Sequence, residues 1–142
     1  MIPPPFEEFA QSGKFEFRAT DDLSLACNAP KDAVGVYVII GVRSGNKEVI
    51  YIGSSGKLLN SGELKIRQGG MHDHLVNGKQ FDAPRRKSWP GQMNDDAFDS
   101  LEVHWAITFD EEFESIPSVV EGEMLQEYFW SMGELPRWNL EV

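Results

Sequence analysis

Cysteine is nearly absent from this chain of 142 residues, which contains only Cys27. One thiol cannot form an internal disulfide and cannot supply the several thiolates of a zinc site. No apolar run approaches the ~20 residues that a transmembrane helix needs, and the first residues lack the basic and apolar segments of a secretory signal. We therefore expect a cytoplasmic protein with no membrane partner, in which Cys27 is a small buried residue.

Positive charge is also scarce, since 13 lysines and arginines stand against 23 aspartates and glutamates, for a net charge of -10. Contacts of lysine and arginine with phosphate supply most sequence-independent affinity for nucleic acid, so this balance argues against a non-specific nucleic-acid binder. The cations are unevenly spread, because nine of them lie between residues 43 and 87 with only four acidic residues. A basic segment on an acidic body indicates either one DNA-facing surface or a solvated surface of uneven charge.

The length and the hydrophobic fraction of 41% predict one domain over residues 1–142. Strand-like alternation and helical periodicity both occur, so we expect an α+β fold. Residues 1–33 are expected to form an N-terminal extension with a short helix and a strand over 14–20. Alternation of apolar residues over 101–109 predicts a further strand.

The stretch from residue 35 to residue 53 predicts a β-hairpin. Two runs of β-branched and aromatic residues, 35–40 and 49–53, are separated by a spacer with Gly-Asn turn chemistry. Because strand side chains alternate between the two faces of a sheet, each tyrosine points away from its immediate neighbours. Tyr37 and Tyr51 are therefore expected to lie side by side.

A helix is expected to begin near Glu63 and to carry Arg67 on the same face as Leu64 and Met71. An arginine held against the body of a domain needs an anionic partner, which is either a carboxylate or a bound phosphate. The pair Gly69-Gly70 is expected to weaken this helix.

Residues 77–99 show no sustained periodicity and contain several prolines and glycines, so we expect a long loop. Within it, three cations precede an indole in the run Arg85-Arg86-Lys87-Ser88-Trp89. That composition suits contact with phosphate and stacking on a base. The alternative is a solvated run of charge with Trp89 folded back on the domain.

The longest helix is expected at residues 119–132, where Val120 and Met124 belong to a broad apolar stripe. A carboxylate on a largely covered helix is costly unless it is paired or binds a metal, so at least one acidic residue should have a partner. The candidates on this helix are Glu121, Glu123 and Glu127.

This pattern of residues resembles the GIY-YIG endonuclease family. In that family a triplet of glycine, aliphatic residue and tyrosine is followed one hairpin later by tyrosine, isoleucine and glycine; here the triplets are Gly35-Val36-Tyr37 and Tyr51-Ile52-Gly53. The family also carries an arginine after the hairpin, a glutamate on a later helix and an asparagine after a proline near the end of the domain. The matching positions are Arg67, Glu127 and Asn139.

The resemblance implies a nuclease core over residues 34–140, built on a small three-stranded antiparallel sheet flanked by helices. It implies hydrolysis of DNA phosphodiester bonds with one Mg²⁺ or Mn²⁺ ion per site, held by Glu127. Tyr37 would be the general base, Arg67 would pair with a phosphate oxygen, and Tyr51 would position water or phosphate. A phenol with a reference pKa of about 10 is a weak base at neutral pH, so Arg67 and the metal would have to lower that pKa.

The remaining candidate positions follow from the same resemblance and from residue type. Asn139 would tie the C-terminal segment to the site. Many members carry a histidine one turn after the arginine, where this chain has Met71, so His72 and His74 are candidates for that role. Glu121 and Glu123 are alternative metal ligands. The residues expected to contact DNA are Gly53, Lys57, Arg85, Arg86, Lys87 and Trp89.

Two other interpretations are consistent with the sequence. The net charge of -10 and the missing histidine favour a catalytically silent module of the same fold, which would bind a protein or nucleic-acid partner. A protein partner would then contact the acidic surface. The third interpretation is an unrelated α+β domain in which the tyrosine hairpin is a coincidence.

Overall fold

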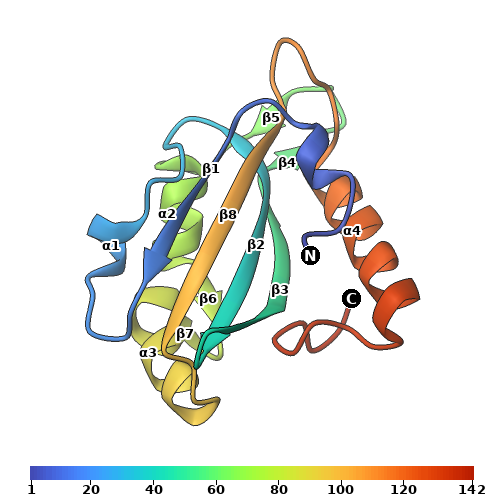
Figure 1. Cartoon of the computed structure of the whole chain (residues 1–142). Helices are drawn as coiled ribbons and strands as arrows, with labels where there is room; N and C mark the ends of the chain where they lie inside the picture. The colour runs from blue at the N-terminus through green and yellow to red at the C-terminus, as the bar shows by residue number, and fades with distance from the viewer.

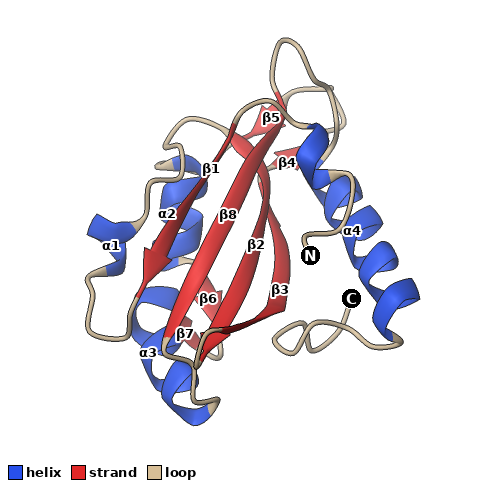
Figure 2. Ribbon diagram, in the orientation of Figure 1, coloured by secondary structure: helices blue, strands red, loops and turns tan.

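Four strands form the central antiparallel sheet of the protein, whose computed structural model describes all residues from Met1 to Val142. The strands are β1 (Ser12–Phe17), β2 (Val34–Arg43), β3 (Asn46–Ser55) and β8 (Ser100–Phe109), in the spatial order β1-β8-β2-β3. Helices lie on both sides of this sheet, as Figure 1 and Figure 2 show. The expected α+β class is therefore confirmed.

The sheet separates two groups of helices (Figure 1). The helices α1 (Leu23–Ala26), α2 (Gly70–Asn77) and α3 (Arg85–Asp95) lie on one side, and α4 (Pro117–Met132) lies on the other. A short 3-10 helix, η1 (Phe6–Glu8), precedes β1. None of the helices combines the length and the apolar character that a bilayer crossing requires. Two small hairpins complete the fold: β4 (Lys57–Leu58) with β5 (Leu64–Lys65), and β6 (Lys79–Gln80) with β7 (Ala83–Pro84).

Each face of the sheet carries its own hydrophobic core, because the side chains of β2 alternate between the two faces. Tyr37 and Ile39 belong to the core that includes residues of α2 and α3, whereas Val36 and Val38 belong to the core that includes residues of α4. Cys27 lies in the first core, as expected, and burial raises the pKa of its thiol to about 11.

The main sheet has four strands where the sequence predicted three. The additional strand is β1, which pairs with β8 from Ser12 opposite Ala106 to Phe17 opposite Leu101. The apolar alternation of residues 14–20 was recognised, but the partner of a strand depends on contacts far apart in the chain. The N-terminal residues therefore contribute directly to the sheet and to both cores, since Phe6 packs in the core beside α4 and Phe17 in the other.

The helix expected to begin near Glu63 is absent, and the chain there forms β5 instead. The helix α2 begins later, at Gly70, after Gly69 at a φ of 87°. A positive φ costs a residue with a side chain but not glycine, so the glycine pair starts this helix rather than weakening its end. Arg67 consequently lies before α2 and not on it.

The loop expected over residues 77–99 is also wrong, because residues 85–95 form α3 after the hairpin of β6 and β7. Pro90 and Gly91 lie inside this helix, and their low helix propensity explains why the sequence pattern did not predict it. Tertiary packing compensates for them. Trp89 and Met93, one turn apart, are completely buried in the core.

The run of cations before Trp89 had suggested that its indole stacks on a nucleobase. Its position in the core excludes this. Its indole is 0% exposed, and its Nε1 donates a hydrogen bond of 2.9 Å to Gln80 Oε1. This outcome matches the alternative in which the indole folds back on the domain.

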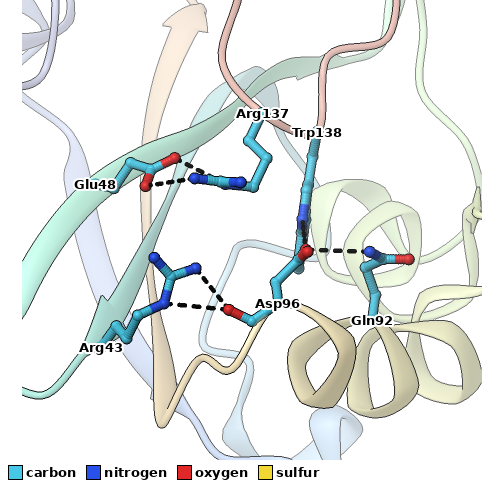
Figure 3. Close-up of polar contacts among 6 residues, drawn as sticks. All are labelled: Arg43, Glu48, Gln92, Asp96, Arg137 and Trp138. Atoms are coloured by element: carbon cyan, nitrogen blue, oxygen red, sulfur yellow. Dashed lines mark hydrogen bonds and ion pairs between the residues drawn. The ribbon is translucent and has the colours of Figure 1, made fainter.

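The C-terminal segment returns to the hairpin and is fixed there by Trp138. Its indole Nε1 donates to Asp96 Oδ2 at 2.8 Å, and the same carboxylate oxygen accepts from Gln92 (Figure 3). The neighbouring Arg137 forms a two-pronged ion pair with Glu48 of β3 (Figure 3). The Arg137 ion pair and a hydrogen bond from Trp138 N to Ile50 O hold the residues that follow α4 against β3, and the Trp138 indole ties them to the end of α3.

Burial of one tryptophan and exposure of another give a direct test of this packing. Trp89→Ala is expected to lower the free energy of unfolding by about 3 to 5 kcal/mol, because it leaves a large cavity in the core. Trp130→Ala, at a side chain that is 70% exposed, is expected to change it by less than about 1 kcal/mol. Urea denaturation measures both. Equal effects in the two variants would contradict the burial of Trp89.

Candidate functional site

The hydroxyl of Tyr37 lies at the centre of a polar cluster on β2. The side chain is only 1% exposed, and its oxygen contacts two groups from different helices. His74 Nε2, from α2, lies 2.9 Å from this oxygen, and Arg85 Nη2, at the start of α3, donates to it at 3.0 Å. All three groups were candidates in the sequence, Tyr37 and His74 for chemistry and Arg85 for contact with DNA, and the structure joins them.

Tyr51 and Gly53 complete the tyrosine pair. The rings of Tyr37 and Tyr51 are stacked, with centroids 6.0 Å apart and an interplanar angle of 27°, so the alternation of the strands predicted their position correctly. Gly53 lies opposite Tyr37 in the register of β2 and β3. A Cβ at Gly53 would lie 2.6 Å from the Tyr37 hydroxyl and 2.7 Å from the Tyr51 ring, so only glycine leaves room for both rings.

Both central groups are neutral at neutral pH. Burial raises the pKa of Tyr37 above its ordinary value; the Arg85 guanidinium opposes this rise, whereas Tyr51 and Glu121 add to it. Burial, together with the positive charges of Arg85 and Arg67, lowers the pKa of His74 to about 4. The cluster therefore rests as a phenol hydrogen-bonded to an uncharged imidazole.

A cavity of about 900 Å³ lies beside the cluster, at the open edge of β3. His74 lines it from the side of α2, while Ser54 and Ser118 line it from the side of α4. Three cationic side chains also line it, namely Lys57, Lys65 and Arg67. Such a concentration of positive charge on an acidic protein favours an anionic ligand.

Arg67 is partly exposed and is not committed to a buried partner. Its Nη2 forms an ion pair with Asp73 at 2.8 Å, so the carboxylate alternative raised by the sequence is present. Because the Arg67 side chain keeps 43% of its surface exposed and lines the cavity, it can still reach an anion there.

Glu121 is the acidic residue of α4 that lies nearest to the cluster. It is half-buried, Ser54 hydrogen-bonds to its carboxylate, and its charge contributes to the raised pKa of Tyr37. Burial raises the pKa of Glu121 itself, and the Ser54 hydrogen bond opposes that rise. Ser54 pairs with Val36, so this contact lies on the α4 face of β3, across the edge strand from the tyrosines.

Glu127 lies elsewhere on α4. Residues 121 and 127 are roughly 120° apart around a helix of 3.6 residues per turn. Glu127 lines a separate cavity with Pro4, Pro5 and Trp130, as does Glu123. The structure does not bring either of these carboxylates to the tyrosine pair.

The remaining candidates do not line the cavity. Asn139 bonds the edge of β3, since its side-chain amide accepts from Ile52 N and donates to Ile52 O, both at 2.9 Å. His72 donates to Ser24 O and lies outside the cluster. Arg86 bonds to Asn77 on the surface, and Lys87 is exposed without a contact to the cavity.

The sequence predicted that Arg85 contacts DNA from a loop, but the residue begins α3 and its side chain is buried. Arg85, Trp89 and Met93 follow one another at intervals of four residues, and all three are buried. On a helix that spacing places them on one face. The four-residue spacing is present in the sequence, but it indicates a shared face only if the segment is already known to be a helix.

The metal implied by the resemblance would have few protein ligands here. No group of three or more His, Cys, Asp or Glu residues is arranged to hold a metal ion. Mg²⁺ commonly keeps several waters and takes only one or two carboxylates together with substrate phosphates. Glu121 does not itself line the cavity, but Ser54, which bonds to its carboxylate, does, and a single carboxylate of this kind fits such an ion.

No protein-family model, no curated protein and no solved structure matches this chain. The resemblance to the GIY-YIG nucleases therefore depends on the motif residues alone, and the site has to be judged by its own geometry.

The neutral state of His74 predicts a pH dependence of stability. The unfolded imidazole takes up a proton near its ordinary pKa of 6.5, whereas the folded one does so only near 4. The contribution of His74 to the free energy of unfolding is therefore fully present above pH 6.5 and is lost as the pH falls towards 4. Allowing for partial solvent exposure, we expect wild type to lose about 2 kcal/mol more than His74→Gln across this window.

Urea denaturation at a series of pH values measures this difference, with His72→Gln as the matched control. That variant should keep the pH dependence of the wild type. The same slope in wild type and His74→Gln would show that His74 is not held neutral by the fold.

Proposed function

We propose that this protein is a phosphodiesterase that cleaves DNA, with the reaction in the cavity at the edge of β3. The observation that carries the proposal is that His74, hydrogen-bonded to the buried Tyr37, lines the same cavity as three cations. Ser54 lines it too and bonds to the half-buried carboxylate of Glu121. These groups come from distant parts of the chain. Hydrolysis of a phosphodiester needs this combination of proton transfer and charge stabilisation.

The cations of the cavity support recognition of a sugar-phosphate backbone. Lys57, Lys65 and Arg67 are exposed side chains around a volume of about 900 Å³, which is larger than a single phosphate requires. A guanidinium can bind phosphate oxygens in a two-pronged geometry, and ammonium groups act as point charges. The net charge of -10 on the whole chain makes contact of DNA with the acidic parts of the surface unfavourable, and so favours binding at a group of cations such as this one.

The Tyr37 and His74 pair supplies the proton transfer in this proposal. Tyr37 is only 1% exposed, whereas His74 lines the cavity, so a proton passes between substrate and Tyr37 through the imidazole. The resemblance assigned the general-base role to Tyr37 alone. Its burial supports an action in partnership with His74 instead.

The carboxylate of Glu121 is the proposed ligand for one divalent cation, Mg²⁺ or Mn²⁺. A bound ion would neutralise charge on the phosphate and on the leaving oxygen. Glu121 is preferred to Glu127 because it is hydrogen-bonded to Ser54, which lines the cavity.

Cleavage assays on supercoiled, branched and single-stranded DNA with Mg²⁺ test this function. Wild type is expected to cut at least one substrate, and Tyr37→Phe is expected to cut it about 100-fold or more slowly, because the variant loses the hydroxyl that exchanges the proton. Identical preparation of the variant controls for contaminating nucleases. Equal rates in both preparations would reject the proposal.

A matched pair of variants identifies the metal-binding carboxylate. We expect Glu121→Gln to abolish Mg²⁺-dependent cleavage and to weaken Mn²⁺ binding measured by electron paramagnetic resonance, because it removes the anionic ligand beside the cavity. Glu127→Gln tests the metal ligand that the resemblance implied. Loss of Mn²⁺ binding in Glu127→Gln, with unchanged Mn²⁺ binding in Glu121→Gln, would reverse the choice between the two residues.

A second candidate function is protein binding without chemistry. It is favoured by large apolar side chains exposed at the end of α4, where Phe129, Trp130 and Met132 are 47%, 70% and 59% exposed. Exposed apolar residues close together on one surface are typical of interaction sites. Cleavage by the wild type that is lost in Tyr37→Phe would exclude a purely binding role.

A further inference from the structure

Arg85 is a buried cation whose hydrogen-bond acceptors are all neutral. The residue is 3% exposed, and its guanidinium donates to three groups: Tyr37 Oη at 3.0 Å, His74 O at 2.8 Å and Gln80 Oε1 at 3.1 Å. None of the ion pairs in the protein includes Arg85. Burial of an unpaired charge is costly, so an anion that forms beside it would be strongly stabilised.

Tyr37 is the contact of Arg85 that can become an anion. The charged and titratable groups around the phenol are Tyr51 from β3, His74 from α2, Arg85 from α3 and Glu121 from α4. Of these, only Arg85 favours the phenolate, since burial, Tyr51 and Glu121 all favour the phenol. The guanidinium therefore has no anion at rest and gains one when Tyr37 loses its proton.

The hydrogen bonds also have a defined direction. A guanidinium can only donate, so the Tyr37 oxygen accepts from Arg85 and has its own proton free for His74 Nε2. The neutral imidazole then carries its proton on Nδ1, which has no hydrogen-bond partner within the protein. Because His74 lines the cavity, Nδ1 is the nitrogen left to contact a ligand there.

We propose that Arg85 is the positioning residue of a proton relay, in which it orients the Tyr37 hydroxyl towards His74 and holds the phenolate formed when the relay donates a proton. The inference rests on the proposed hydrolysis of a phosphodiester in the cavity. It makes the relay a general acid for the leaving oxygen, in place of a base for the attacking water.

The electron pair of the breaking bond between phosphorus and the leaving oxygen stays on that oxygen, which takes the proton of His74 Nδ1. His74 Nε2 takes the proton of Tyr37, whose phenolate pairs with Arg85. The attacking water forms the new bond to phosphorus and releases a proton to solvent. A solvent proton later binds His74 Nδ1, and Nε2 returns its proton to Tyr37, which restores the resting state.

A leaving group that needs no proton separates this role from a merely structural one. When sulfur replaces the leaving oxygen of the DNA, the leaving group is a thiol with a pKa of about 8.5, which departs readily as the anion. Arg85→Gln is expected to slow cleavage of ordinary DNA about 100-fold. Substrates with sulfur at the 3′ or at the 5′ bridging position are both tested, and the one that the wild type cleaves faster should be slowed only a few-fold. Arg85→Lys should recover part of the loss, because it keeps the charge.

Arg18→Gln is the matched control, since it removes the same charge at a side chain that is 62% exposed and does not line the cavity. It should cut both substrates as the wild type does. An equal loss on both substrates in a folded Arg85→Gln would overturn the relay and leave Arg85 a structural residue. Absence of cleavage by the wild type would instead reject the proposed function.

A second measurement tests the pairing of Arg85 with Tyr37 without any cleavage. A fluorinated tyrosine, which is more acidic, is incorporated at position 37, and its ionisation is followed by ¹⁹F NMR. Arg85→Gln is expected to raise the midpoint by about one to three pH units, and Arg85→Lys should stay close to wild type. The same midpoint in Arg85→Gln and wild type would overturn the inference.

Discussion

The hydroxyl of Tyr37 is the point on which the site depends, because it joins three elements that are far apart in the chain. It lies on the central strand β2 and contacts His74 of α2 and Arg85 of α3. Burial makes each contact matter, since an unsatisfied polar group inside a protein is costly. The position of both helices against the sheet is therefore coupled to the hydrogen bonds of this oxygen.

The edge position of β3 explains how residues from both faces of the sheet meet. A strand inside a sheet would separate the tyrosines from α4, but β3 has a neighbour on only one side. His74 therefore reaches the cavity from one face, and Ser54 with Glu121 approaches it from the other. Asn139 bonds to the backbone of Ile52, and so ties the C-terminal segment to the same strand.

The distribution of charge is consistent with this geometry. Within a chain of net charge -10, the cations that line the cavity come from the short hairpin of β4 and β5 and from the residues before α2. Arg85, by contrast, is removed from solvent and serves Tyr37 rather than a ligand. Two arginines of the same basic segment thus have different surroundings, which their sequence neighbourhood does not distinguish.

Local patterns in the sequence determined the hairpin, the strand β8 and the helix α4, because periods of two and 3.6 residues are properties of single elements. They also determined that Tyr37 and Tyr51 share a face. They failed at α3, where Pro90 and Gly91 oppose a helix that buried Trp89 stabilises. A fourth strand was missed because the partner of a strand is not a local property.

Only the tertiary structure decided which side chains join the tyrosines. The sequence offered Glu121, Glu123 and Glu127 on one helix, and the rotation of α4 against the sheet places Glu121 nearest to them. It likewise offered several arginines, and the docking of α3 selected Arg85. The physical reason is that periodicity fixes the faces of an element, whereas the packing of one element on another fixes what each face meets.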